Sequence, residues 1–144
     1  MLGRPVRDCI VRDEPLCGHP ADTVHDAVVR MAEHCCSSIL VCEGEQLRGI
    51  FTERDLLVRV VAAGRDPDKT KLAEVMTADP DTIEGSEPVI EAIRRMDECC
   101  YRHLPVMENG KILGVVALRD LPLQDLVAMA PELDQRHSLA ERMW

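Results

Sequence analysis

The sequence predicts an α+β fold built from two repeats, each a small mixed β-sheet packed with helices. The first observation is an internal duplication: residues 24–56 align without a gap on residues 89–121, at an offset of 65, with 12 of 33 positions identical. The second is that each copy reads as an amphipathic helix followed by two short apolar runs around a turn. A repeat of this length normally means two copies of one supersecondary unit that share a core.

Each copy opens with an amphipathic helix. Apolar residues recur at i, i+3, i+4, i+7 and i+11, starting at Val24 in copy one and at Val89 in copy two. This spacing gives each helix one buried face. Cys35 and Cys100 end the two stripes, so we expect both thiols to pack in the interior.

Two short strands and a tight turn follow each helix. The turns are indicated by Glu43-Gly44-Glu45 and by Asn109-Gly110, of which the Asn-Gly pair is the stronger hairpin signature. Short apolar runs bounded by polar residues are typical of half-buried strands. The expected strands are residues 39–42 and 47–51 in copy one and residues 104–107 and 112–116 in copy two.

The remaining elements complete a strand, helix, strand, strand, helix unit. A helix is expected from Thr52 to Val61, closed by Gly64, and in copy two Pro122 resets the corresponding helix. Further short strands are expected at residues 13–17 and 79–82, where the offset is 66, the second after a helical turn at residues 71–76. Residues 65–71 read as the linker between the copies.

This organisation divides the chain into residues 1–66, residues 67–130 and a tail of residues 131–144. Residues 123–144 have the apolar spacing of a terminal amphipathic helix broken at Pro131. That tail either packs onto a partner subunit or frays.

Composition narrows the class of protein. Of the 144 residues, 46% are hydrophobic and 30% are charged, which describes a soluble globular protein, and no apolar run has the length of a membrane span. The N-terminus carries charges where a signal peptide has its apolar region, so we expect a cytoplasmic protein. A net charge of −9 and three aromatic residues argue against nucleic acid as a partner.

Seven cysteines form no metal or disulfide pattern, because the count is odd and no C-x-x-C occurs. We expect reduced, mostly buried thiols and no metal site. A redox or metal-binding role of the cysteines remains an alternative.

The two copies close on related phrases, Gly49-Ile50-Phe51-Thr52-Glu53-Arg54-Asp55 and Gly114-Val115-Val116-Ala117-Leu118-Arg119-Asp120. A strand entering a helix at Thr52 presents backbone N–H groups and the positive end of the helix dipole, which favour phosphate. An Asp one turn later can accept hydrogen bonds from a ribose diol, and an arginine can neutralise phosphate. A glycine in the strand would let a ligand approach the backbone closely.

The same phrase also has a structural interpretation. Thr52 and Asp55 have the spacing of a capping box, which stabilises a helix by about 1 kcal/mol without any ligand. Asp120 is present although Ala117 has no hydroxyl to cap with, and this favours binding. From these residues alone the two interpretations are about equally supported.

A family resemblance adds to these patterns. The carrying residues are Val75 to Ile83, then Arg102 to Val106, then Asn109-Gly110 and Gly114-Val115-Val116. In this order and duplication they resemble the cystathionine beta-synthase (CBS) domain, and the two copies resemble a CBS pair, or Bateman module. The resemblance covers about residues 4–130, which leaves no catalytic domain, so it implies a protein that is not an enzyme.

The resemblance implies a stand-alone regulatory module that needs no cofactor and that binds an adenosine-containing ligand such as AMP, ADP, ATP or S-adenosylmethionine, with or without Mg²⁺. It also implies two copies related by a pseudo-twofold axis, a homodimer, and a conformational signal to an unidentified regulated protein. A CBS-like structural or interaction protein with degenerate sites is the alternative.

The resemblance further implies two unequal clefts, each lined by both copies. Gly49, Thr52 and Asp55 match the family pattern fully, whereas Ala117 stands where copy two should have a hydroxyl. The expected residues of the first site are Cys17, Thr52, Arg54, Asp55, Arg102 and His103, and those of the second site are Ser37, Ser38, Thr82, Arg119 and Asp120. Cys17 is a weaker hydrogen-bonder than Thr82, its counterpart.

Overall fold

The computed structural model describes residues 3–12 and 14–121 and divides the chain into two compact units. We call Pro15–Pro80 the first-copy unit, and Met1–Glu14 together with Asp81–Trp144 the second-copy unit. The helix expected from Pro122 and the tail of residues 123–144 lie outside the described residues.

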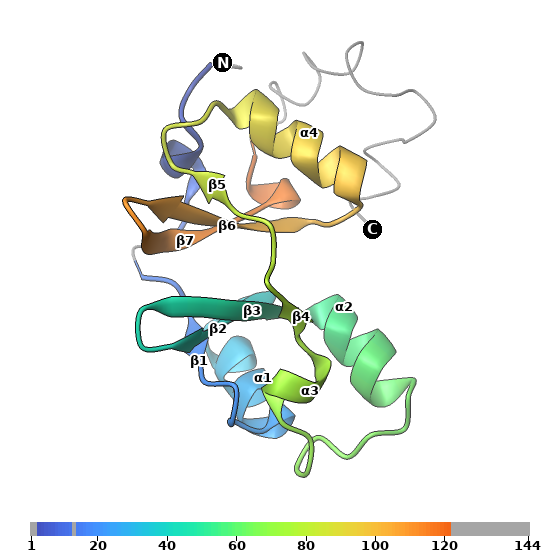
Figure 1. Cartoon of the computed structure of the whole chain (residues 1–144). Coiled ribbons are helices and arrows are strands. Elements are labelled where there is room, and N and C mark those ends of the chain that lie inside the picture. The colour runs from blue at the N-terminus through green and yellow to red at the C-terminus, as the bar shows by residue number, and fades with distance from the viewer. Residues whose placement is uncertain (1–2, 13, 122–144) are drawn as a thin grey trace. The chain divides into compact units, whose positions relative to one another are not determined.

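The first-copy unit is a four-stranded sheet with helices against it (Figure 1). Strand order is β1-β2-β3-β4, with β1 parallel to β2 and the other two pairs antiparallel. Its elements are β1 (Cys17–Gly18), α1 (Val24–Glu33), β2 (Ser38–Glu43), β3 (Gln46–Thr52), α2 (Glu53–Asp55), the π-helix η2 (Leu56–Val61), α3 (Leu72–Val75) and β4 (Thr77–Ala78).

The second-copy unit repeats this plan with a three-stranded sheet of order β5-β6-β7. Here β5 is parallel to β6, and β6 is antiparallel to β7. Its elements are the 3₁₀-helix η1 (Val6–Cys9), β5 (Ile83–Glu84), α4 (Val89–Cys99), β6 (His103–Glu108), β7 (Lys111–Ala117) and the 3₁₀-helix η3 (Leu118–Asp120). The α+β class and the duplicated mixed sheets predicted from the sequence are therefore confirmed.

The hairpins follow the turn chemistry of the sequence. Asn109 and Gly110 have φ values of 53° and 77°, as both central residues of a type I′ turn require. The short strands expected upstream of each first helix are present but begin later, at Cys17 and at Ile83.

The helix expected from Thr52 to Val61 is present, but most of it has π geometry. Only Glu53–Asp55 is α-helical, and Leu56–Val61 forms the π-helix η2. Gly64 follows at φ +73°, in the left-handed conformation that ends helices. Apolar periodicity predicts a helix here but does not distinguish i→i+5 from i→i+4 hydrogen bonding.

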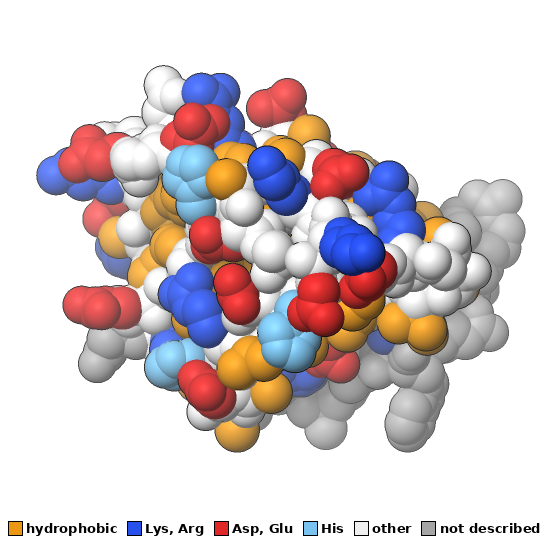
Figure 2. All heavy atoms as spheres, turned by 90° about the horizontal axis from the view of Figure 1, so that it is seen from below, with side chains coloured by type: hydrophobic (Ala, Val, Ile, Leu, Met, Phe, Trp, Pro, Cys, Tyr) orange, Lys and Arg blue, Asp and Glu red, His pale blue; other side chains and the backbone are white. Residues whose placement is uncertain are grey.

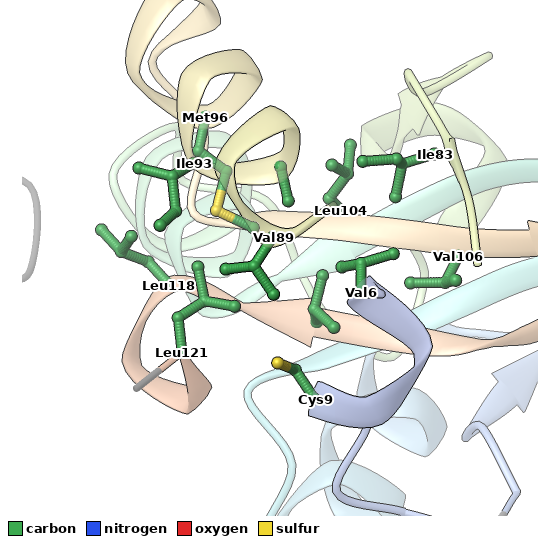
Figure 3. Close-up of a cluster of buried hydrophobic side chains, with 12 residues drawn as sticks. Val6, Cys9, Ile83, Val89, Ile93, Met96, Leu104, Val106, Leu118 and Leu121 are labelled. Atoms are coloured by element: carbon green, nitrogen blue, oxygen red, sulfur yellow. The ribbon is translucent and has the colours of Figure 1, made fainter. Parts of the chain in front are cut away.

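A short helical segment precedes each copy in the sequence, η1 before copy one and α3 before copy two, and we call these the leading segments. Each leading segment packs in the unit of the other copy. In the second-copy unit, Val6 donates its N–H to the carbonyl of Glu87 at 2.8 Å. In the first-copy unit, Leu72 donates in the same way to Asp22 at 2.9 Å. Figure 3 shows Val6 and Cys9 of η1 in one cluster with side chains of α4 and β6. Residues 6–9 and 72–75 correspond at an offset of 66, so this exchange is reciprocal.

The residues expected to link the copies pack within the first-copy unit. Thr70 is buried, and its carbonyl accepts from the N–H of Val24 at 2.8 Å. The chain passes from one unit to the other between Pro80 and Asp81. The compact units therefore divide the chain differently from the linear repeats.

The expectation that most cysteines are buried is wrong. All seven are free thiols, but within them Cys9 alone is buried, while Cys35, Cys99 and Cys100 are exposed. The helices end before the apolar stripes do, because Cys35 and Cys100 adopt left-handed φ values of 54° and 63°. Their side chains therefore leave the helical faces on which the spacing placed them.

Candidate ligand-binding site

Asp55 closes a capping box at the end of β3. Its Oδ2 accepts from the N–H and the hydroxyl of Thr52 at 3.0 and 3.2 Å, and Thr52 Oγ1 accepts from the N–H of Asp55 at 3.3 Å. The Asp55 residue is only 8% exposed. The structural interpretation of this phrase is therefore present in the molecule, and any ligand-binding role comes in addition to it.

Arg59 is a partner of Asp55 that the sequence analysis missed. Its Nε lies 3.7 Å from Asp55 Oδ1, one helical turn away. Its Nη1 donates to the carbonyls of Val75 and Met76 at 3.2 and 2.8 Å, where α3 ends. The i, i+4 spacing of an acid and a base was the available signal. Arg59 thus ties the carboxylate of the Gly-to-Asp phrase to the segment that enters β4.

The N-terminus of α2 is less open to phosphate than expected. Glu53 donates its N–H to the carbonyl of Ser37 at 3.1 Å, and Asp55 donates to Thr52. Two of the first three helical N–H groups are therefore already bonded within the protein. A phosphate near this end depends more on side chains than on the helix terminus.

The second copy keeps half of the capping box. Asp120 Oδ2 accepts from the N–H of Ala117 at 3.3 Å, although Ala117 has no hydroxyl to return the bond. The N–H of Leu118 donates to the carbonyl of Arg102 at 2.8 Å, as Glu53 does to Ser37 in copy one. The presence of Asp120 is thus explained by backbone capping, and it is not independent support for binding.

Two arginines lie near one histidine at the end of the β6–β7 hairpin. His103 starts β6 and pairs with Ala117 of β7, while Arg102 precedes it and Arg119 lies in η3. Burial, then the positive charges of Arg119 and Arg102, lower the pKa of His103 to about 4. His103 is therefore neutral at pH 7 in the ligand-free protein, and its neighbourhood has a positive potential.

The two motif glycines pack against protein side chains. A Cβ on Gly49 would lie 2.5 Å from Met76 Sδ and 2.8 Å from the carbonyl oxygen of Thr77. A Cβ on Gly114 would lie 2.9 Å from Cγ2 of Ile10. The expectation that these glycines admit a ligand is wrong in this structure, because the leading segments of the repeats fill that space.

The remaining predicted residues lie on the expected elements. In the first-copy unit, Ser38 pairs with Thr52 across β2 and β3, Ser37 is buried beside them, and Arg54 is exposed on α2. Thr82 precedes β5, and its carbonyl accepts from Arg95 Nη1 at 2.7 Å.

Each unit gathers its own share of the predicted residues. Ser37, Ser38, Thr52, Arg54 and Asp55 belong to the first-copy unit, as does Cys17. The second-copy unit holds Thr82, Arg102, His103, Arg119 and Asp120. The combination of residues from both copies in one cleft stays a prediction.

The surface carries both signs of charge. On the face seen in Figure 2, acidic and basic side chains alternate with histidine and apolar groups. Within the part of the chain that the structure describes, no three His, Cys, Asp or Glu side chains gather in a way that suits a metal ion. In that same part, no helix combines the length and apolar character needed to cross a membrane.

The low pKa of His103 predicts that acid destabilises the protein. Between the ordinary pKa of 6.5 and the folded value of about 4, the unfolded chain binds a proton that the native protein does not. Stability is thus complete above pH 6.5 and falls as the pH decreases, by up to about 3 kcal/mol from this group. Urea unfolding at pH 7.5 and 4.5 measures the change. The His103→Gln variant should lose about 2.5 kcal/mol less between these pH values, and an equal loss would contradict the assignment.

These features define a class of protein, a duplicated α+β module in which each copy presents a Gly-to-Asp phrase. In copy two, the end of the β6–β7 hairpin away from its turn is also positively charged. The sequence profile of the CBS domain matches residues 6–62 and 72–121. The chain belongs to the CBS domain family and contains two tandem CBS domains.

Comparison with known proteins agrees with this assignment to the CBS domain family. The uncharacterized protein MK0525 of Methanopyrus kandleri is 32% identical over 114 residues, which are 78% of this chain and 58% of that protein. The chain thus spans little more than half of that relative. A putative signal-transduction protein with CBS domains from Burkholderia ambifaria is 34% identical, with a TM-score of 0.74 over 81% of this chain and 85% of that one.

A more distant structure shares the fold. The CBS domain protein PAE2072 from Pyrobaculum aerophilum, solved as a complex with AMP, has a TM-score of 0.78. It is 22% identical and covers 88% of this chain and 98% of its own.

Proposed function

We propose that this CBS pair is a regulatory module that binds an adenosine-containing nucleotide and signals by a change of conformation or of dimer geometry. The observation that carries the proposal is the group formed by Arg102, His103 and Arg119. In a chain of net charge −9, Arg119 and Arg102 create a local positive potential that adds to the effect of burial in lowering the pKa of His103. A phosphate is the kind of ligand that such a group attracts.

Binding of a phosphate there would be coupled to proton uptake. An anion beside His103 favours its protonated form, which the two arginines and burial disfavour in the free protein. We infer that the histidine gains a proton as the phosphate binds, so affinity for phosphate-bearing ligands increases below neutral pH.

Asp55 is the proposed acceptor for the ribose. Its Oδ2 is used by Thr52, but its Oδ1 has only the long 3.7 Å contact with Arg59 in the hydrogen bonds and ion pairs described above. A ribose diol that approaches Oδ1 can share it with Arg59. Because Arg59 also holds the end of α3, occupation of Asp55 would reach the segment before β4.

We further propose that the module is a homodimer. The π-helix η2 exposes three large apolar side chains, Leu57, Val58 and Val61, which are 63%, 50% and 64% exposed. Such a helical stripe would be covered by association with a second copy of the chain through an isologous contact. The regulated protein that receives the signal is unidentified.

The alternative is a CBS-like structural protein whose sites are degenerate. It is favoured by the use of Asp55 and Asp120 as helix caps and by the packing of Met76 and Ile10 over the motif glycines. These contacts stabilise the fold without any ligand, so this interpretation needs a direct test.

A thermal-shift panel separates the two functions. The reduced chain is heated with AMP, ADP, ATP, GMP, GTP or S-adenosylmethionine, each with and without magnesium. A ligand at 100 times its dissociation constant should stabilise the protein by about 2.7 kcal/mol. We expect stabilisation by at least one adenosine-containing ligand.

The Arg102→Gln variant tests the carrying observation. It should weaken binding of an adenine nucleotide about tenfold or more while adenosine, which lacks the phosphate, is unaffected. The matched control is Arg94→Gln, which changes an exposed arginine on α4.

If none of the compounds in the thermal-shift panel stabilises the wild-type chain, that result would contradict the sensor proposal and support the structural one.

A further inference from the structure

A short strap connects α3 to the second-copy unit. We give this name to residues 75–78, which contain the end of α3 and both residues of β4, after which the chain enters the other unit (Figure 1). β4 lies at the edge of its sheet, is exposed, and pairs with β3 in two register positions. Asp79 follows with a left-handed φ of 46°, which is uncommon for a residue other than glycine. The backbone alone therefore holds the strap weakly, and such a segment can open locally.

Arg59 supplies an additional contact that holds the strap. The last carbonyls of a helix have no partner within the helix. At the end of α3, the carbonyls of Val75 and Met76 accept instead from Arg59 Nη1 at 3.2 and 2.8 Å. Because Arg59 belongs to η2, this contact fastens the strap to another element of the first-copy unit.

The strap covers the motif glycine of copy one. The Sδ of Met76 and the carbonyl oxygen of Thr77 lie 2.5 and 2.8 Å from where a Cβ on Gly49 would be. Access to the backbone of Gly49 therefore requires the strap to move.

Copy two differs at both parts of this arrangement. The side chain that covers its motif glycine is Ile10, the counterpart of Met76. A β-branched side chain is stiff, whereas methionine is flexible and adapts to a new position. At the position of Arg59, copy two has the neutral Gln124, which lies outside the described residues. The combination of a movable cover and a charged fastener is therefore a feature of copy one.

Arg59 also faces Asp55 across a gap. Its Nε lies 3.7 Å from Asp55 Oδ1, which is longer than a hydrogen bond. A hydroxyl group can donate and accept at once, so it can donate to Asp55 Oδ1 and accept from Arg59 Nε. Such a hydroxyl would lie about 2.8 Å from each atom, beside the line that joins them. It would complete a hydrogen-bonded chain from the carboxylate through Arg59 to the carbonyls of the strap.

We propose that Arg59 is a latch that keeps the strap closed over Gly49, and that a ribose hydroxyl bound at Asp55 tightens this latch. In the ligand-free protein, the latch limits how often residues 75–78 open. When the hydroxyl bridges Asp55 and Arg59, opening becomes rarer, and the connection to the second-copy unit becomes more rigid. The latch does not depend on a ligand, whereas its tightening rests on the proposed function.

Hydrogen exchange of the full-length chain, measured by mass spectrometry, tests the latch without a ligand. The amides of Met76 and Asp79 report opening, because they donate to carbonyls of α3 and β3 at 2.8 and 3.0 Å. Arg59→Gln removes the charged fork and should speed exchange in peptides that cover residues 75–79 about fivefold. Exchange in α1 should stay as in the wild type, which shows that the variant is folded.

The matched control is Arg65→Gln. Arg65 also reaches α3, but through an exposed ion pair with Glu74 at 3.7 Å, and such pairs contribute little. This variant should change strap exchange by less than about twofold. Equal exchange in Arg59→Gln and the wild type, or equal acceleration in both variants, would overturn the latch.

AMP and 2′,3′-dideoxyadenosine monophosphate together test the tightening, because both carry the phosphate but only AMP has the two ribose hydroxyls. At equal occupancy, fixed by calorimetry, AMP should slow strap exchange in the wild type about fivefold and the dideoxy compound far less. AMP bound to Arg59→Gln should leave strap exchange unchanged. Equal slowing by the two nucleotides, or slowing in Arg59→Gln, would overturn the tightening. Absence of AMP binding would overturn the tightening together with AMP sensing, and the ligand-free comparison would still decide the latch.

Discussion

The Gly49→Ala variant is expected to lose about 3 kcal/mol of stability, because an added Cβ overpacks a closed contact. That Cβ would lie 2.5 Å from Met76 Sδ and 2.8 Å from the backbone oxygen of Thr77. The Met76 side chain can move, but the Thr77 carbonyl belongs to β4, which pairs with β3 at this position. Relief of the clash therefore requires the β3–β4 pair to separate.

The matched control is the same substitution at the equivalent position of copy two. The three atoms nearest to a Cβ on Gly114 all belong to the side chain of Ile10, with Cγ2 at 2.9 Å. That side chain can rotate, so Gly114→Ala should cost about 1 kcal/mol. Urea unfolding followed by circular dichroism measures both variants. Equal losses would show that β4 yields as readily as a side chain, against the packing described above.

Asp55→Ala is expected to reduce both stability and ligand affinity more than Asp120→Ala does. Removing the Asp55 carboxylate leaves the N–H of Thr52 without its acceptor in a largely buried place and removes the 3.7 Å contact with Arg59, a loss of about 2–3 kcal/mol. The Asp120 carboxylate accepts a single bond from Ala117 in the hydrogen bonds described here, so its loss should cost about 1 kcal/mol.

A second variant separates the cap from the proposed ribose contact. Thr52→Ala removes the hydroxyl of the capping box but leaves the Asp55 carboxylate in place. It should lower stability by about 1 kcal/mol and change nucleotide affinity by much less than Asp55→Ala does. Isothermal titration calorimetry with the ligand found in the thermal-shift panel measures affinity. If Asp55→Ala binds as tightly as the wild type, or if Asp120→Ala loses more, then the sites are ranked wrongly.

The secondary-structure elements were predictable because short sequence patterns determine them. The helices beginning at Val24 and Val89, the two hairpins and the Asn109-Gly110 turn follow from apolar period and turn chemistry. Helix ends were less predictable. The stripes continue to Cys35 and Cys100, yet both residues adopt left-handed conformations, which apolar spacing does not encode.

The sequence identified the Gly-to-Asp phrases of the candidate site, but it did not predict the contacts that their residues make. Thr52 and Asp55 were identified, and their capping geometry was weighed as one of two interpretations. Arg59 was missed because its significance depends on the carbonyls of Val75 and Met76, which lie 16 and 17 residues away. The low pKa of His103 likewise depends on burial and on Arg119 from another element.

By itself, the sequence determined that the chain is a duplicated α+β module of the CBS family, because a repeat and the order of its motifs can be recognised without knowing which residues are in contact. Tertiary structure alone decided which core each leading segment joins and what fills the space over Gly49 and Gly114. The physical reason is that periodicity reports which face of an element is buried, whereas the identity of the partner is settled by packing between residues far apart in the chain.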